Sequence, residues 1–238
     1  MQLTKKQIKE SNIIDAAESV IGRVGFKNAK MEDIAAEASI TKVTLYSYFQ
    51  SKENLYLAIS YTALQKLISE YYETIDAFKS KTGLDCTIAL TETFMNFCER
   101  NYLYTEALLE YFAIMRSTSQ GVDTTRLTDA EKESIYYKKL QDIHNLPFKL
   151  TAKQIERGIQ DGSVKPDADP MFHTLQGWTT IVGYAKVIAA SGENHSPFLN
   201  VDLHSLKAFN LKLARFLLEN NVMHFSGKSN SASLSQGV

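Results

Sequence analysis

The sequence predicts an all-α protein, in which a small N-terminal unit of three helices precedes a larger helical body. Apolar residues recur at helical spacing along most of the 238 residues, and the alternation typical of strands is missing. Proline, which interrupts helices, occurs only four times. Hydrophobic residues make up 44% of the chain and charged residues 22%, as is ordinary for a globular protein.

Three N-terminal segments should fold around one small core. The first helix is expected to begin after Thr4, whose hydroxyl can cap a free N–H, and to end at Gly25. Its apolar stripe comprises Ile13, Ile14, Ala17, Val20, Ile21 and Val24. Two shorter helices follow, and their inward residues should be Ile34, Ala35, Ala38, Leu45 and Phe49.

A long fourth helix should connect this unit to the body. Ser51 is placed to cap it, and Glu53 lies in its first turn, where a negative charge is favourable. The helix can run to about Phe78, and Gly83 is expected to begin a break. The N-terminal unit and the body would then share this helix.

The body is predicted from apolar stripes separated by breaks. Its expected elements are helices at Leu84–Glu99 and Leu103–Met115, a polar loop at Ser117–Thr128, a helix start at Thr128, and a helix that Pro147 kinks or splits and that ends near Gly158 to Gly162. Pro166 and Pro170 precede two long helices, at about 168–190 and 201–220. Both are apolar on more than one side, which predicts that a second subunit covers them. Residues 226–238 are small and polar and predict a disordered tail.

Charge is distributed unevenly along the chain. The formal net charge is -1, so any affinity for nucleic acid must come from a local patch. Residues 1–66 hold nine basic and seven acidic side chains, and residues 67–238 hold 17 and 20. No apolar run approaches the roughly 18 residues of a membrane helix, and the N-terminus is polar, so we expect a cytoplasmic protein without membrane contact.

Signatures of catalysis are missing from the sequence. The five histidines never approach a metal-ligand spacing such as HExxH, and there is no Gly-rich phosphate loop and no GxSxG motif. We therefore expect no catalytic residue, no metal and no cofactor. If Cys86 and Cys98 share a helix, they lie roughly 18 Å apart, too far for a disulfide, and are predicted to be small buried hydrophobes.

The segment from Met31 to Lys52 reads as a short helix, a tight turn and a second short helix. Two helices joined by so short a turn are typical of a DNA-binding helix-turn-helix, whose second helix enters the major groove. The exposed face of that second helix should comprise Thr41, Lys42, Thr44, Tyr46 and Tyr48. A plain three-helix unit with a solvated polar face would have the same composition, so composition alone leaves both alternatives open.

On the DNA-binding hypothesis, the side chains of the second helix have distinct tasks. Lys42 can donate to guanine acceptors, and Val43 and the Thr44 methyl can lie against a thymine methyl. Phosphate oxygens should be within reach of Tyr46, Tyr48 and Lys52.

The order of five linked motifs resembles the DNA-binding domain of the tetracycline-repressor (TetR) family over roughly residues 9–68. The motifs are Ile13–Ala17, Val24–Phe26, Asp33–Ala35, Thr44–Phe49 and Ser51–Leu55. The resemblance implies an all-helical homodimer that binds a palindromic double-stranded DNA operator. It also implies a body, residues 69–225, that binds a small-molecule inducer and dimerises through the last two long helices. By motif position, the DNA contacts carried over are Lys42, Val43, Thr44, Tyr46, Tyr48 and Lys52, with Thr41 at the helix start.

Three residues depart from the family pattern. Ser39 stands where the turn commonly has glycine, and it adds strain if that residue needs a positive φ. Val43 stands where the family often has a small residue, so the operator preference should be unusual there. Lys30 replaces a common Thr or Ser cap at the second helix and offers a phosphate contact instead.

In the body the resemblance is architectural only, and an inducer pocket must be inferred from aromatic residues. The candidate pocket residues are Phe94, Phe97, Tyr104, Tyr111, Phe112, Met115 and Trp178. Each can equally be a core residue, and Trp178 can equally lie in a dimer interface.

The leading hypothesis is a ligand-responsive transcriptional repressor, not an enzyme, that an inducer releases from DNA by shifting the population of head spacings. One alternative is a DNA-binding activator or chromosome-organising protein without an inducer. Another is a small-molecule-binding or enzymatic helical domain whose N-terminal unit is vestigial. The sequence identifies neither the inducer nor the operator.

Overall fold

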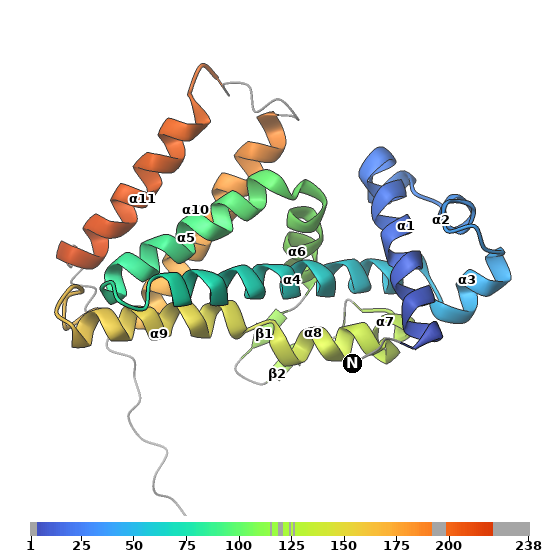
Figure 1. The fold of residues 1–238 in the computed structure, drawn as a ribbon, viewed down its shortest axis with the longest axis horizontal. Helices are drawn as coiled ribbons and strands as arrows, with labels where there is room; N and C mark the ends of the chain where they lie inside the picture. The colour runs from blue at the N-terminus through green and yellow to red at the C-terminus, as the bar shows by residue number, and fades with distance from the viewer. Residues whose placement is uncertain are drawn as a thin grey trace, which may run out of the picture.

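The structure is a computed structural model that describes residues 4–114, 116–118, 121–123, 125, 127–191 and 199–220. In these ranges it is almost entirely helical, as predicted, with one short antiparallel hairpin (Figure 1). The elements are α1 Lys5–Asn28, α2 Met31–Glu37, α3 Lys42–Tyr48, α4 Lys52–Ala77, α5 Gly83–Arg100, α6 Tyr102–Ile114, β1 Arg116–Thr118, β2 Gly121–Asp123, α7 Asp129–Glu133, α8 Ile135–Ile143, α9 Leu146–Gln160, α10 Pro170–Ser191 and α11 Leu203–Asn220.

Helices α1, α2 and α3 form the N-terminal unit, which we call the head. Thr4 caps α1 as predicted, in a reciprocal capping box with Gln7. The predicted inward residues are buried, except for the half-buried Ala38. Val24, predicted to belong to the stripe of α1, is 44% exposed because it lies in an open groove beside α2.

Gly25 interrupts α1, as expected of a helix-ending glycine. Its φ of +76° lies in the left-handed region, which glycine adopts without a steric penalty. One further helical turn, residues 26–28, follows the kink. The regular part of the helix therefore ends where predicted, and the last turn points in a new direction.

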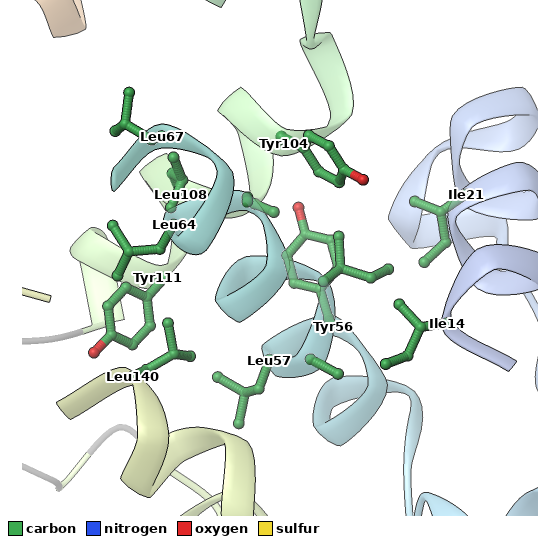
Figure 2. Close-up of a cluster of buried hydrophobic side chains, with 14 of the residues drawn as sticks. Ile14, Ile21, Tyr56, Leu57, Leu64, Leu67, Tyr104, Leu108, Tyr111 and Leu140 are labelled. Atoms are coloured by element: carbon green, nitrogen blue, oxygen red, sulfur yellow. The ribbon is translucent and has the colours of Figure 1, made fainter. Parts of the chain in front are cut away.

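Helix α4 connects the head to the body (Figure 1). It begins after Ser51, whose hydroxyl oxygen accepts a hydrogen bond from the Asn54 N–H at 3.2 Å. It contacts α1 near its start and α5, α6, α8 and α9 along its length. Figure 2 shows Tyr56 and Leu64 of this helix among buried side chains of the neighbouring helices. Because one apolar cluster runs through both units, head and body share a core.

Helices α5 to α11 form the body, in which α5 and α9 approach very closely. A Cβ atom on Gly83 would lie 2.1 Å from the backbone nitrogen of Gly158. The predicted break at Gly83 is therefore wrong, since Gly83 is the first residue of α5 and a glycine is needed for this contact. Pro147 splits the chain as predicted, since α8 ends at Ile143 and α9 begins at Leu146.

The predicted loop at Ser117–Thr128 contains the hairpin. Strands β1 and β2 pair Arg116 with Asp123 and Thr118 with Gly121. Strands of three residues are too short to show the alternation by which a strand is recognised in sequence. The predicted tail, residues 226–238, lies outside the described residues.

Both cysteines are free and buried, as predicted. Burial raises the pKa of the Cys98 thiol to about 12, so this group is unreactive at neutral pH. Among the described helices, none has the length and apolar character needed to cross a membrane.

Candidate nucleic-acid interface and body cavity

The turn between α2 and α3 is fixed by its own backbone. The Ser39 N–H donates to Ala36 O, and the Ile40 N–H donates to Ala35 O, both at 3.0 Å. Ser39 adopts a φ of +52°, in the left-handed region that a side chain other than glycine strains. The predicted strain at this turn is therefore present, and the turn holds α3 at a fixed angle to α2.

Helix α3 has an inner apolar face and an outer polar face. Leu45 and Phe49 are 0% and 3% exposed and anchor the helix to the head core. Val43 is 81% exposed and Tyr46 is 40% exposed, so both project outward. Tyr48 is only half-buried, and its ring packs against the core. The outer face of a short helix presented in this way fits the width of a major groove.

Two of the predicted DNA contacts already have partners within the head. The Thr41 hydroxyl caps α3 by accepting from the Thr44 N–H at 3.1 Å. The Lys42 ammonium donates to Glu32 of α2, and this hydrogen bond raises the pKa of Lys42 and lowers that of Glu32. Both side chains of the pair are more than half exposed, so a base or phosphate can replace Glu32 at little energetic cost.

Lys52, predicted to contact a phosphate, has a structural role in the described head. Its Nζ donates to Phe26 O at 2.8 Å and to Ala29 O at 3.1 Å, and approaches Lys27 O at 3.4 Å. It also lies 4.6 Å from the centroid of the Phe26 ring. The kink at Gly25 brings these carbonyls together, and an ammonium has three donors with which to satisfy them. Lys52 therefore fastens the end of α1 to the start of α4.

Other cations surround α3. Lys30 is exposed at the start of α2 and makes no capping hydrogen bond there, as expected from the departure at this position. Lys5 and Lys9 of α1 line a groove whose other wall is the turn at Ser39 and Ile40. The motif order did not single out these two lysines. Their spacing of four residues, which puts both on one face of α1, is the signal that could have found them.

The body contains a cavity between α4, α5, α9, α10 and α11. Of the candidate pocket residues, the structure places Phe94, Phe112 and Trp178 in its wall. The side chains of Phe97, Tyr104 and Tyr111 are buried in the adjoining core, and Met115 lies outside the described residues.

Aromatic rings dominate one wall of this cavity. The Trp178 ring centroid lies 5.6 Å from that of Phe94, 4.8 Å from Phe112 and 5.3 Å from Phe148. Phe148 was not recognised in the sequence because its helix had no assigned pocket role. The space free to a molecule the size of water is about 40 Å³, which is room for a few waters. A larger ligand must therefore move these rings apart.

An apolar surface covers the outer sides of α10 and α11, which form a V away from the head in Figure 1. Its largest exposed side chains are Met171, Phe172, Leu175, Phe209, Leu213 and Phe216. These residues belong to the two stripes, or lie beside them, that predicted a second subunit. Among the described residues, no group of three or more His, Cys, Asp or Glu could hold a metal ion.

Known proteins resemble this chain in sequence and in fold. The profile described as "Bacterial regulatory proteins, tetR family" matches residues 13–59. The fatty acid metabolism regulator protein of Bacillus subtilis (strain 168) is 22% identical over 167 residues, which are 70% of this chain and 76% of that protein.

Solved structures resemble the fold over most of the chain. FadR from Bacillus subtilis in complex with stearoyl-CoA matches with a TM-score of 0.59 at 18% identity, covering 90% of this chain and 99% of that one. AibR in complex with isovaleryl coenzyme A and operator DNA matches with a TM-score of 0.61 at 14% identity, covering 89% and 98%.

A helix-turn-helix head that shares its core with a larger helical body defines a DNA-binding regulator of transcription. The matched residues 13–59 cover α1 to α3 and the start of α4. The chain belongs to the TetR family of transcriptional regulators.

Proposed function

We propose that the protein is a homodimeric repressor that binds a palindromic operator and is released by a small-molecule inducer held in the body cavity. The observation that carries this is the exposed α3 face on a head that shares α4 and a continuous core with the cavity. Two heads held about 34–36 Å apart would place both α3 helices in successive major grooves.

The apolar surface on α10 and α11 supports the dimer. Phe209 is 61% exposed and Phe216 is 51% exposed, and patches of this kind on a soluble surface mark protein interfaces. A second copy of the same surface would cover both helices in an isologous interface. The TetR resemblance uses the same two helices.

The aromatic cavity supports the inducer. A ligand that separates the rings around Trp178 binds better to a widened body, and α4 carries the change to the head. The relatives with bound stearoyl-CoA and isovaleryl coenzyme A support a ligand with an apolar portion. A regulator of this kind acts on the bacterial chromosome, which supports a cytoplasmic protein without an enzymatic role.

A fluorescence-polarisation titration with DNA from upstream of the protein's own gene tests the proposal. We expect tight binding to one palindromic segment, two subunits per site, above a weaker and steeply salt-dependent background. Salt-sensitive binding without a preferred site would contradict sequence-specific repression.

The narrow cavity favours a second candidate, a regulator whose packed body takes no inducer. Such a protein would bind its operator with the same affinity whatever small molecule is added. A screen of candidate ligands against the operator complex separates the two candidates.

A further inference from the structure

We propose that the body cavity selects an uncharged ligand whose apolar part carries an O–H or N–H donor, and that it rejects carboxylates. This inference rests on the proposed function, because it assigns the chemical class of the inducer. Its basis is the charge of the cavity wall and the hydrogen-bond state of its threonines.

The cavity wall is uncharged. Among the described residues that line it there is no Asp, Glu, Lys or Arg. His173 is the titratable base of the wall, and burial lowers its pKa against the opposing effect of Asp169, so it is neutral at pH 7. An ionised carboxylate entering here would lose its hydration without gaining a cationic partner, which is strongly unfavourable.

Four threonines line the cavity, and all four spend their hydroxyl proton in the same way. Each donates to the carbonyl oxygen four residues earlier in its own helix. The bonds are Thr87 to Gly83 at 2.9 Å, Thr91 to Thr87 at 3.1 Å, Thr151 to Pro147 at 3.0 Å and Thr174 to Pro170 at 2.8 Å.

These bonds leave acceptor capacity on the cavity side. A threonine hydroxyl has one proton and two lone pairs, so a hydroxyl that donates to the backbone can still accept. Thr87, Thr91 and Thr174 are 4%, 8% and 5% exposed, so water reaches them poorly. A donor on the ligand would complete these groups, whereas an ether or ester oxygen would face lone pairs.

The rest of the wall fits an apolar ligand body. Trp178, Phe112 and Phe148 provide ring surfaces, and Ile155 and Ile181 provide aliphatic ones. The Gln176 amide is partly engaged, since its Nε2 donates to the Thr180 hydroxyl at 3.2 Å. The wall thus combines a large apolar surface with a few hydroxyl acceptors.

A matched set of probes tests the inference. Trp178 is the one tryptophan of the chain and lies in the cavity wall, so its fluorescence reports occupancy. We would titrate the full-length protein at pH 7 with 4-ethylphenol, 4-ethylanisole and 4-ethylbenzoate, which share an apolar body. The phenol should bind at least about fivefold more tightly than the anisole, the value of one neutral hydrogen bond, and the benzoate most weakly.

Two threonines of α5 provide the variants. Thr91→Val keeps the shape of the side chain and removes the acceptor, so it should bring the phenol within about twofold of the anisole. Thr93→Val is the control, because the Thr93 hydroxyl bonds Thr74 outside the cavity, and this variant should keep the preference.

Each other outcome would overturn the inference. Equal binding of the three probes, or tightest binding of the benzoate, would leave an inducer pocket of different selectivity. Failure of all three to bind would also reject it. Operator binding, measured on the same protein without a probe, separately decides whether the proposed function stands.

Discussion

The Tyr104 hydroxyl of α6 donates to Glu18 Oε2 of α1 at 2.8 Å and joins the body to the head. Lys66 of α4 donates to the same hydroxyl, with its Nζ 4.2 Å from the centroid of the Tyr104 ring. Figure 2 shows the Tyr104 side chain pointing towards α1. The other Glu18 oxygen, Oε1, is buried and has no hydrogen-bond partner among the described residues. Burial raises the pKa of Glu18, although Tyr104 and Lys66 act to lower it.

Replacing Glu18 by glutamine should stabilise the protein at neutral pH. Because the Glu18 pKa is raised above its ordinary 4.5, the folded protein binds more protons than the unfolded chain between pH 4.5 and the raised value. The carboxyl therefore contributes stability below that window and loses it as the pH rises. Glutamine keeps an acceptor for Tyr104 without the buried charge.

Urea unfolding at pH 4 and at pH 7 measures this effect. Glu18→Gln should exceed the parent in unfolding free energy at pH 7 and approach it at pH 4. The exposed Glu92 provides the control, and Glu92→Gln should show no such difference. An equal gain for Glu18→Gln at both pH values would contradict a charge effect.

Removing the Lys52 ammonium should weaken the head itself. Lys52→Ala leaves the carbonyls of Phe26 and Ala29 without their charged donor, at a cost of about 1–3 kcal/mol in unfolding free energy. Lys30→Ala removes an exposed cation and should leave stability unchanged. On operator DNA, Lys30→Ala should reduce the slope of log K against log salt by about 0.9 if Lys30 contacts a phosphate. A stable Lys52→Ala protein with only a smaller salt slope would return Lys52 to the predicted phosphate role.

Local chemistry explains why much of the head could be predicted from sequence. A helix cap needs one side chain and a backbone N–H two or three residues away, so Thr4, Ser51 and Thr128 identify helix starts without any knowledge of the fold. The burial of Leu45 and Phe49 likewise follows from spacing within one short helix. The TetR motifs add only their order.

Contacts between distant segments explain what the sequence did not predict. Lys52 meets carbonyls more than twenty residues earlier, and its capping role requires the kink at Gly25. The cavity wall combines five helices, so spacing within one helix could not separate Phe94 from Phe97. The aromatic cluster of α5 and α6 was recognised, but which of its rings face the cavity depends on packing.

Relieving the strained turn should stabilise the head. Ser39 holds a φ of +52°, a conformation that glycine adopts without the Cβ penalty. Ser39→Gly should therefore raise the unfolding free energy by about 0.5–1 kcal/mol, after allowance for the greater entropy of glycine in the unfolded chain. Thermal unfolding followed by circular dichroism measures the gain. Ser39→Ala keeps the Cβ and should not show it; a gain from alanine equal to that from glycine would exclude backbone strain as the cause.

A methyl group at Gly83 should separate α5 from α9. Its Cβ would lie 2.1 Å from the Gly158 backbone nitrogen, which cannot move without its helix. We expect Gly83→Ala to lose about 3 kcal/mol of unfolding free energy, near the upper end for overpacking. Gly22 of α1 is the control, since a Cβ there meets nothing within 4 Å. Gly22→Ala should gain about 0.5–1 kcal/mol from helix propensity, and a similar gain at Gly83 would contradict the close contact.

A charge on the apolar surface of α11 should separate the proposed dimer and with it weaken operator binding. Phe209 is 61% exposed in the single chain, and a glutamate there would be buried without a partner at a dimer interface. Phe209→Glu should elute as a monomer in size-exclusion chromatography with light scattering. Because two linked heads bind far more tightly than one, operator affinity should fall at least about a hundredfold. Ile135→Glu changes an equally exposed residue of α8, 60% exposed, and should remain dimeric. If Phe209→Glu stays dimeric and binds the operator as the parent does, the subunits meet through another surface.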